Sequence, residues 1–484
     1  MQNSITAFFA ADNRALFGSS ASAEKTLEYY TKQISDSGCT DKVVLRYNGE
    51  PRGKSLYATT DIEKGKSILT ELAAFAIQSK ENKGIAQACQ RCLQFCNTPS
   101  TQIELLLQRN LTAAEAEEVR KAESSIASKD WIHGFSGSKT VQCRCGELYC
   151  SVDCREKDGL NGHSEICAAT NPAVAAFKEH AEETNETFLL AFKVFGFIAK
   201  NIKAHPIPSS AEALQAAVWP IRVFAKDYWW NVCMPDEAEE EDPEELQRAL
   251  KLLLKDSLHF LSEVFRDCPE MSPVLNVDFY GLLMGIFERN NVSIVTPSPL
   301  LPLLEHLPSP IMESILERAS QFISSASSGH DHEHGHEHGH EGCHDHGGHE
   351  EGNADPFEAL DALVAEGSGL HYLQATINHS CAPNAMVFKD AAGLDSSSSS
   401  WSLGSISGNV IRDGRTVIRA IKPIKAGDEI TISYLDEGGH DDFEDQDGFA
   451  TEEEIDEEER EWRAMSLREY GIEKCACPKC VQKP

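Results

Sequence analysis

The feature that most constrains this chain is a dense group of cysteine and histidine residues between residues 89 and 167. Its eight ligand-forming residues occur in closely spaced pairs: Cys89 and Cys92, Cys143 and Cys145, Cys150 and Cys154, and His163 and Cys167. Eight thiolate or imidazole ligands suffice for two tetrahedral zinc ions. Each pair closes a small chelate ring, and the next pair then joins distant parts of the chain. Isolated cysteines are more often buried as small apolar residues, so this pattern predicts two zinc sites.

The remaining composition describes a globular protein that keeps its thiols reduced. Hydrophobic residues make up 41% of 484 residues, which is enough for about two to four domains. Residues 1–38 lack a basic segment followed by an apolar core, so we expect no secretion signal. No apolar run approaches the ~20 residues of a membrane helix. In a reducing compartment, clustered thiols among the 16 cysteines indicate zinc rather than disulfides, and we expect a cytoplasmic or nuclear location, or both.

The chain is strongly acidic, with a formal net charge of −33. Residues 436–461 hold 15 acidic residues and one arginine and supply −14 of that charge, which leaves −19 for the rest. Such a field repels nucleic acid and attracts cationic partners such as lysine-rich protein tails. The acidity of this one segment is also explained as a solubilising feature. We expect a basic protein partner, no direct nucleic-acid binding and no membrane partner.

Two segments are predicted to be disordered because they contain few apolar residues. Residues 324–355 are rich in Ser, Gly, His and Glu, and hold nine of the 18 histidines between residues 330 and 349. Dense imidazole binds Zn, Ni or Cu weakly, so metal buffering and a solvated insertion are alternative roles. The second segment is the acidic run at residues 436–461.

The rest of the chain shows the apolar periodicity of strands and helices. The expected strands are residues 43–47, 55–59, 67–72, 416–421 and 429–434. The expected helices are residues 104–126, 187–199, 211–223, 243–265 and 357–365.

The end of the cysteine group resembles a MYND zinc finger, from Tyr149-Cys150 through Cys154 and His163 to Cys167. In that family the ligands of two zinc ions interleave. The resemblance therefore implies one ion on Cys89, Cys92, Cys150 and Cys154, and another on Cys143, Cys145, His163 and Cys167. The chain departs from the family in two ways, by one intervening residue between Cys143 and Cys145 where two are usual, and by a long insert before Cys143.

Two later segments resemble the signature segments of SET-domain methyltransferases. They are Asn378–Asn384, with the sequence NHSCAPN, and Gly427–Tyr434, with the sequence GDEITISY. Upstream, Arg52–Ala58 (RGKSLYA) resembles the first SET strand and turn, which approach the cofactor, with Ser55 where the family more often has glycine. The order of these three pieces is that of the SET-and-MYND family.

Three cysteines near the C-terminus, Cys475, Cys477 and Cys480, make a zinc site one ligand short of a tetrahedral set. In SET enzymes the missing ligand comes from the Asn-His-Ser-Cys segment, which is Cys381 here. The spare cysteine and the incomplete site explain each other, and the resemblance implies three zinc ions in all.

The family resemblance also implies roles for individual residues. S-adenosylmethionine would be held by Arg52, Gly53, Lys54, Leu56, Asn378 and His379. The family's helical insert gives an asparagine that contacts the cofactor; Asn290 stands at this place, with Asn291 as a rival and helix capping as an alternative. Tyr434 would orient the amine and the methyl group. The family fold threads its two signature segments past each other as a pseudoknot, an exception to the rule against threading.

The fold class implied is α+β: a β-rich SET domain with a pseudoknot, an inserted MYND zinc finger, a helical insert and a C-terminal post-SET zinc site. The expected parts in chain order are an N-terminal extension (1–41), SET N-terminal strands (42–85), MYND-type finger (86–168), helical insert (169–323), His-rich segment (324–355), SET core (356–435), acidic segment (436–461) and post-SET zinc motif (462–484).

The function implied is transfer of methyl groups from S-adenosylmethionine to lysine in a histone or another basic protein, by a monomer. Peptide partners could also bind the MYND finger. A different class remains open: a zinc-stabilised interaction scaffold with weak or no catalysis. Tyr434 and the intact Asn378–Asn384 segment favour the enzyme, whereas Ser55 and the Cys143-x-Cys145 spacing keep the scaffold open. A metal-trafficking protein would explain only the histidine tract.

Overall fold

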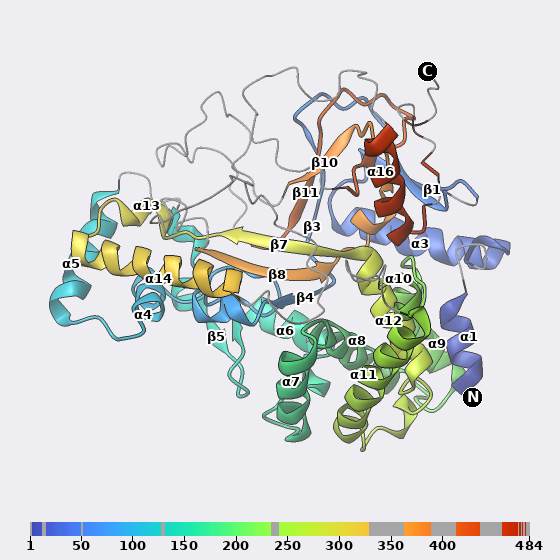
Figure 1. Cartoon of the computed structure of the whole chain (residues 1–484), viewed down its shortest axis with the longest axis horizontal. Helices are drawn as coiled ribbons and strands as arrows, with labels where there is room; N and C mark the ends of the chain where they lie inside the picture. The colour runs from blue at the N-terminus through green and yellow to red at the C-terminus, as the bar shows by residue number, and fades with distance from the viewer. Residues whose placement is uncertain are drawn as a thin grey trace.

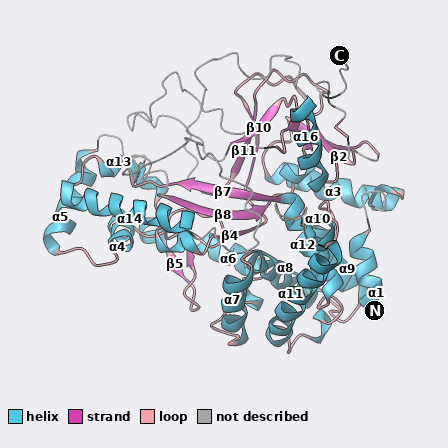
Figure 2. Ribbon diagram, in the orientation of Figure 1, coloured by secondary structure: helices cyan, strands magenta, loops and turns pink. Residues whose placement is uncertain are grey.

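The computed structural model of the chain is a mixed helix-and-strand protein, which confirms the predicted α+β class. The residues that the structure describes are 2–11, 16–49, 52–126, 131–233, 242–328, 363–388, 413–435, 457–472, 474, 475, 477 and 480. Short sheets lie at the centre, with helices below them and to one side (Figure 1), and the strands are concentrated in that central region (Figure 2).

Short antiparallel strands form the first part of the SET region. β1 (Val43–Tyr47) pairs with β2 (Lys54–Ala58). β3 (Ser67–Glu71) pairs with β11 (Thr416–Ala420), which also pairs with β10 (Ala385–Phe388). The first four predicted strands are thereby confirmed. Their β-branched and aromatic residues favour extended backbone, and β11 is buried at all five positions rather than on one face only.

A second sheet has the order β4 (Phe75–Gln78), β8 (Val364–Leu370) and β7 (Asn291–Pro297). Of the helix predicted at residues 357–365, the first six residues lie outside the described part. The prediction is wrong for the next segment, since Val364 already belongs to β8. The strand is explained by the close approach of the β8 backbone to the β4 backbone. A Cβ at Gly367 would lie 1.9 Å from the Ile77 carbonyl oxygen, and such close contact between strands favours glycine.

The helical insert packs beneath these sheets. Its main helices are α7 (Ala173–Thr184), α8 (Thr187–Ala204), α9 (Ala211–Arg222), α10 (Trp229–Val232), α11 (Pro243–Val264) and α12 (Val277–Asn290). α8 lies at the centre and buries Phe188, Phe192 and Phe195, each at most 2% exposed. The three long helices predicted here are confirmed, and α8 continues to Ala204 because its apolar periodicity reaches Ile202.

The structure corrects the single helix predicted between the two ligand groups. α4 (Pro99–Leu107) ends at Gln108, whose φ of 53° is left-handed, and α5 (Ala113–Ser125) is a separate helix. Thr112 accepts a hydrogen bond from the Glu115 N–H, and the Glu115 carboxylate accepts one from the Thr112 N–H. This capping box begins a new helix, and its Thr-x-x-Glu pattern was present in the sequence.

A second apolar core holds α4 and α5 against α13 (Leu301–Leu304) and α14 (Ser309–Ser328). α14 therefore enters the predicted His-rich segment by five residues. α16 (Glu457–Glu469) begins inside the predicted acidic segment, since Glu, Arg and Met favour helix once the chain turns away from the Asp- and Gly-rich part.

The cysteine-rich finger contributes β5 (Val141–Gln142), β6 (Leu148–Tyr149) and α6 (Val152–Leu160). It docks on α8 through glycines: Gly162 has φ 112°, and a Cβ there would lie 2.3 Å from the Phe197 amide nitrogen. The backbone of the finger thus contacts the backbone of the helical insert directly.

The N-terminal extension is folded rather than a loose tail. α1 (Gln2–Ala10) packs on the helical insert, where the Phe9 and Phe279 rings stack with centroids 4.4 Å apart. α3 (Ser20–Asp36) lies along β1 and buries Thr26, Tyr30 and Ile34 on one face. No described helix is long and apolar enough to span a membrane.

Candidate active site and metal centres

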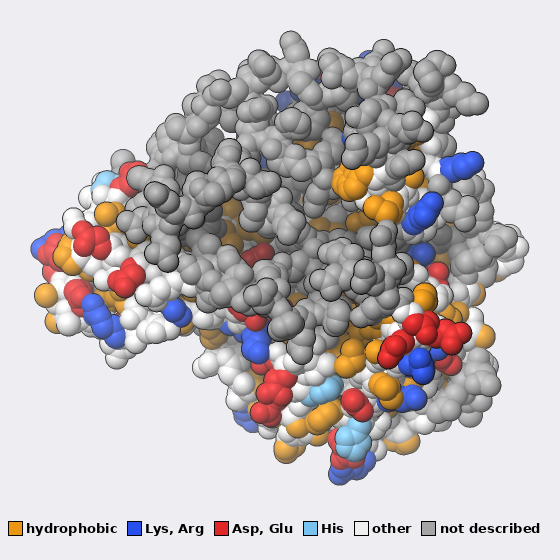
Figure 3. All heavy atoms as spheres, in the orientation of Figure 1, with side chains coloured by type: hydrophobic (Ala, Val, Ile, Leu, Met, Phe, Trp, Pro, Cys, Tyr) orange, Lys and Arg blue, Asp and Glu red, His pale blue; other side chains and the backbone are white. Residues whose placement is uncertain are grey.

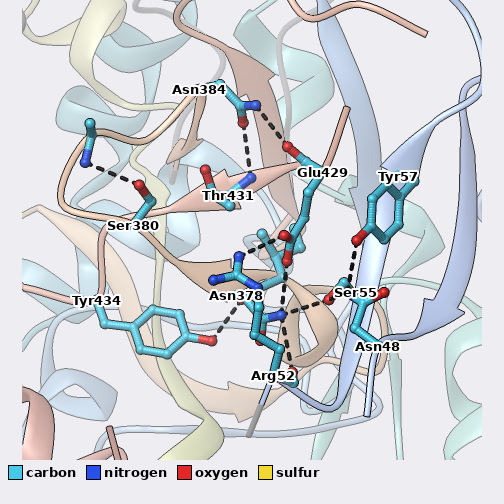
Figure 4. A network of polar contacts seen from close by, with 12 residues as sticks. Asn48, Arg52, Ser55, Tyr57, Asn378, Ser380, Asn384, Glu429, Thr431 and Tyr434 are labelled. Atoms are coloured by element: carbon cyan, nitrogen blue, oxygen red, sulfur yellow. Dashed lines mark hydrogen bonds and ion pairs between the residues drawn. The ribbon is translucent and has the colours of Figure 1, made fainter. Parts of the chain in front are cut away.

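The two signature segments cross through a pair of parallel strands. β9 (Asn378–His379) pairs with β12 (Thr431–Ile432) in parallel, with Asn378 opposite Thr431 and His379 opposite Ile432. The Asn384 side chain ties the crossing together: its Nδ2 donates to the Glu429 carbonyl at 2.8 Å, and its Oδ1 accepts from the Thr431 N–H at 2.9 Å (Figure 4). The last predicted strand is confirmed only over these two residues.

Asn378 connects this crossing to the first strand segment. Its Nδ2 lies 2.7 Å from Ser55 Oγ, 3.0 Å from Glu429 Oε1 and 3.2 Å from the Arg52 carbonyl (Figure 4). The other carboxylate oxygen of Glu429 pairs with the Arg52 guanidinium at 2.6 Å. Ser55, at the place where the family has glycine, is fully buried, so its hydroxyl is used as a hydrogen-bonding partner rather than left without one.

Tyr434 lies directly beside the histidine of the first signature segment. Its hydroxyl donates to the Ile377 carbonyl at 2.7 Å, and its backbone N–H donates to His379 Nδ1 at 3.0 Å. Burial raises the pKa of Tyr434, so the phenol stays protonated at neutral pH. The Tyr470 ring lies 4.9 Å from the Tyr434 ring, centroid to centroid. Tyr434 therefore sits in an aromatic environment with a fixed hydroxyl direction.

His379 is neutral, and its tautomer follows from its two contacts. Burial lowers the pKa of His379 to about 4. Nδ1 accepts a hydrogen bond from the Tyr434 N–H, so the ring proton belongs on Nε2, which lies 3.1 Å from Cys381 Sγ. A cofactor residue predicted from the sequence thus contacts a predicted zinc ligand.

The other predicted cofactor residues lie around this crossing. Gly53 takes a left-handed φ of 61°. Leu56 is fully buried, and its carbonyl accepts from the Ile430 N–H at 2.8 Å. The Lys54 side chain is buried, and its Nζ donates to Tyr30 Oη at 3.1 Å and to the Val223 carbonyl.

The two candidate asparagines differ in what their amides contact. Asn290 ends α12, and its Nδ2 donates to the Ala225 carbonyl at 2.8 Å and to the Ile286 carbonyl at 2.7 Å. Its amide nitrogen therefore supports the fold. Asn291 Oδ1 is buried with no hydrogen-bond partner among the described residues. The Asn290 amide nitrogen is therefore already used by two carbonyls, whereas the Asn291 amide oxygen remains available to a ligand.

The twelve predicted metal ligands come together in three sets of four. We call these the first finger set (Cys89, Cys92, Cys150, Cys154), the second finger set (Cys143, Cys145, His163, Cys167) and the C-terminal set (Cys381, Cys475, Cys477, Cys480). Within each set the ligand atoms all lie within 4.8 Å of one another. The grouping matches the interleaved pattern that the resemblance implied.

The geometry and donors of the three sets fit zinc. Sulfur atoms on one tetrahedral zinc, each at about 2.3 Å, lie about 3.8 Å apart. The corresponding Sγ–Sγ distances are 3.6 Å for Cys92–Cys150, 3.7 Å for Cys143–Cys167 and 3.5 Å for Cys381–Cys480. One residue between Cys143 and Cys145 is therefore enough to bring both thiols into the second finger set.

A carboxylate stands behind the histidine of the second finger set. His163 Nε2 faces the sulfurs of Cys143 at 3.4 Å and Cys145 at 3.6 Å. Its other nitrogen, Nδ1, faces Asp158 Oδ2 at 3.8 Å, and Asp158 also accepts a hydrogen bond from Tyr149 Oη at 2.7 Å. Such outer carboxylates orient metal-bound histidines.

Residues of the site that were not predicted as site residues include Glu429, Tyr470 and Tyr30. Glu429 stood inside the second signature segment and could have been found there. Tyr470 stood five residues before Cys475, in a stretch with no other signal. Tyr30 lies in a stretch whose sequence shows no motif that points to the site.

Comparison with known proteins agrees with this arrangement. The SET domain family matches residues 53–435. Histone-lysine N-methyltransferase ATXR2 of Arabidopsis thaliana is 24% identical over 98% of this chain and 97% of its own length. Protein-lysine N-trimethyltransferase SMYD5 of Gallus gallus is 25% identical over 90% of this chain and 85% of its own, and human SMYD5 is 23% identical over 91% and 86%. These relatives confirm the resemblance inferred from the motifs, and the chain belongs to the SET-domain family.

Proposed function

We propose that this protein transfers methyl groups from S-adenosylmethionine to a lysine side chain of a basic protein. The observation that carries the proposal is the parallel β9–β12 pairing, which gathers Asn378, His379 and Tyr434 from two distant segments. The activities named for ATXR2 and SMYD5 support the same reading.

The residues present fit this cofactor. Lys54 is a buried ammonium with no carboxylate partner among the described residues, and it can pair with the carboxylate of the methionine part. Asn291 Oδ1 is a buried acceptor that has no donor among the described residues. Arg52, Gly53, Leu56, Asn378 and His379 would complete the binding site. When bound, the cofactor supplies a methyl group on a positively charged sulfur.

Tyr434 has the geometry to orient the lysine amine. Its proton is given to the Ile377 carbonyl, so the phenol oxygen keeps its lone pairs free to accept an N–H of the amine. That contact fixes the amine while leaving the nitrogen lone pair for attack, and positioning of this kind supplies much of the rate enhancement of a displacement. The buried aromatic surroundings also favour the uncharged amine.

The chain's charge suits a basic substrate such as a histone or another lysine-rich protein. The net charge is −33, and acidic and basic side chains are interspersed on the described surface in Figure 3. Attraction would therefore act over the whole molecule rather than through one patch on that face. We also propose three bound zinc ions, a monomeric enzyme, and action in the cytoplasm or nucleus, where thiols stay reduced.

The test is transfer of labelled methyl from S-adenosylmethionine to histones, ribosomal proteins and a cell extract, with Tyr434→Phe alongside. We expect labelled protein with the wild type and a loss of at least about 100-fold with the variant, while S-adenosylhomocysteine binding by calorimetry persists. Absence of both labelling and cofactor binding would favour the zinc-stabilised scaffold instead.

A further inference from the structure

The buried amine of Lys54 is held by a helix that lies outside the SET-family match. Lys54 is 6% exposed, and its Nζ lies 3.1 Å from Tyr30 Oη and beside the Val223 carbonyl. Tyr30 belongs to α3, and the family match begins only at residue 53. The N-terminal extension therefore reaches the start of β2, where the cofactor residues stand.

α3 is well built to hold this position. Ser19 caps its N-terminus by accepting the Ser22 N–H at 3.2 Å. Thr26, Tyr30 and Ile34 recur at four-residue spacing and are all buried, so they form one continuous face. Tyr30 is 1% exposed and its ring also lies under the Lys54 ammonium, 5.3 Å from centroid to Nζ. The direction of its hydroxyl is thus fixed by packing.

The neighbouring residue on α3 contacts the chain shortly before the second cofactor segment. The Tyr29 and Tyr372 rings meet edge to face with centroids 5.4 Å apart. The backbone N–H of Tyr372 donates to Glu71 at 2.9 Å, and the chain runs on from there to Asn378. α3 therefore contacts Lys54 of the first cofactor segment and Tyr372, six residues before the second.

The contacts of Lys54 leave one of its three N–H groups without a partner among the described residues. One N–H points to Tyr30 Oη and another to the Val223 carbonyl. Both acceptors are neutral, so the positive charge is not compensated by a carboxylate among the described residues. A buried ammonium in this state is costly, and an anionic ligand would offset that cost.

The loop after α9 connects this amine to the end of α12. Val223 accepts from Lys54, and Ala225 accepts from Asn290, whose neighbour Asn291 carries the unpartnered Oδ1. The carbonyls of Val223 and Ala225, which contact Lys54 and Asn290, thus belong to one short segment. A buried ammonium and a buried carbonyl oxygen are the groups that pair with the carboxylate and the ammonium of an amino acid.

We infer that Tyr30 is a positioning residue of the cofactor site, which aims the Lys54 ammonium at the carboxylate of the cofactor's amino-acid part. The inference rests on the proposed function and extends the site beyond the SET-family match to α3. It predicts that the N-terminal extension contributes to binding the amino-acid part of the cofactor and not its nucleoside part.

The experiment compares two ligands by calorimetry on the full-length protein. S-adenosylhomocysteine carries the carboxylate, and 5′-methylthioadenosine lacks the amino-acid part. Tyr30→Phe should weaken S-adenosylhomocysteine binding by about ten-fold, the typical effect of one hydrogen bond to a charged group, and leave methylthioadenosine binding unchanged. In turnover assays it should raise the KM for S-adenosylmethionine and leave kcat nearly the same.

One further variant tests the charge of Lys54, and another is a control for the loss of a buried tyrosine hydroxyl. Lys54→Met keeps the buried stem and removes the charge; it should fold as stably as the wild type and lose the preference for S-adenosylhomocysteine over methylthioadenosine. Tyr280→Phe removes the hydroxyl of another fully buried tyrosine, which bonds Ser257 at 2.9 Å, and should bind both ligands like the wild type.

Three results would overturn the inference. Unchanged S-adenosylhomocysteine binding in Tyr30→Phe, or equal weakening of both ligands, would make Tyr30 a packing residue only. A wild type that binds both ligands equally would remove the role of Lys54 while the proposed function stands. A wild type that binds neither ligand would overturn the inference and the proposed function together.

Discussion

The first finger set and the C-terminal set each consist of four cysteines but lie in different surroundings. In the first finger set, Cys92 and Cys150 are 58 residues apart and fully contained in one domain insert. In the C-terminal set, Cys381 and Cys475 are 94 residues apart and join the SET core to the end of the chain. The first finger set therefore connects residues within one insert, and the C-terminal set connects two distant parts of the chain.

The first finger set contacts two parts of the fold, the helical insert and the residues just before β11. In the loop between its first two ligands, the Gln90 carbonyl accepts a hydrogen bond at 2.8 Å from Lys193 Nζ of the helical insert. The Cys92 carbonyl accepts a hydrogen bond at 2.6 Å from the N–H of Gly414, just before β11. A Cβ at Gly414 would lie 2.5 Å from Ile294 Cγ2. This centre supports the architecture.

The C-terminal set lies next to the proposed reaction centre. His379 Nε2 contacts Cys381 Sγ at 3.1 Å, and Tyr434 packs against the cluster that holds Cys381 and Cys477. We therefore predict that the first finger set serves stability and that the C-terminal set serves catalysis, because the two sets contact different parts of the fold. Four predictions test this contrast.

Cys381→Ala should give the largest effect on activity. We expect the zinc content to fall from three to two per chain, and methyl transfer to drop by more than about 100-fold, because His379 loses its Nε2 partner and the chain end loses its anchor. Elemental analysis and methyl transfer measure both. Cys268→Ala, a buried thiol outside the three sets, is the control. An unchanged zinc content would refute the shared site.

Cys92→Ala should show the opposite signature. The binding free energy of a structural zinc contributes to folding, so we expect its loss to lower the thermal midpoint by about 10 °C. The turnover of the remaining folded protein should stay within about three-fold of the wild type, because distant sites act independently. Calorimetric melting and activity per folded molecule distinguish the two effects. If kcat fell as steeply as in Cys381→Ala, the contrast between the centres would be wrong.

Asp158→Asn tests the outer carboxylate of the second finger set. We expect the zinc affinity of this set to fall by about 10- to 100-fold, with kcat unchanged when zinc is in excess. Competition with a chelator measures the affinity. Asp153→Asn on the same helix, an exposed partner of Lys157, should release zinc like the wild type. Equal affinities in the two variants would remove Asp158 from the metal centre.

The smallest effect is a pH response confined to the cofactor side. Burial lowers the pKa of Lys54 to about 7, and only the protonated amine attracts a carboxylate. S-adenosylhomocysteine affinity should therefore fall as pH rises through 7, by up to about ten-fold per pH unit until the raised pKa of the bound state is reached. Calorimetry at about pH 6 to 8 measures this.

Other groups near Lys54 are separated by the choice of ligand. Burial raises the pKa of Tyr30 well above its usual value, so it stays neutral. Burial also raises the pKa of Glu71 to about 7, but Glu71 holds the backbone N–H groups of residues 372–374 rather than Lys54. Its titration would affect methylthioadenosine as well. A pH response shared by both ligands would therefore assign the effect to Glu71.

Much of the site could be predicted from the sequence because its signals are local. The zinc ligands occur in closely spaced pairs, and the signature segments carry their residues in contiguous runs. The long amphipathic helices α8, α9 and α11 followed directly from apolar periodicity. The break between α4 and α5 also has a local signal, the capping pattern that begins at Thr112.

Other features depended on contacts that no sequence interval announces. The Asn290 amide donates to the Ala225 carbonyl because α12 packs against the loop after α9. The same packing buries Asn291 Oδ1 without a partner among the described residues. β8 at Val364 follows from pairing on both sides with β4 and β7, which overrode the helical pattern read across residues 357–365.

The sequence by itself determined which residues can bind metal and which segments form the SET signature, because chelation and motif chemistry act over a few neighbouring residues. Only the tertiary structure decided that Glu429 pairs with Arg52, 377 residues away, and that Tyr30 holds Lys54. These contacts arise where elements with no shared local pattern are packed together, since burial fixes the partners of a charged group once the surrounding chain has excluded water.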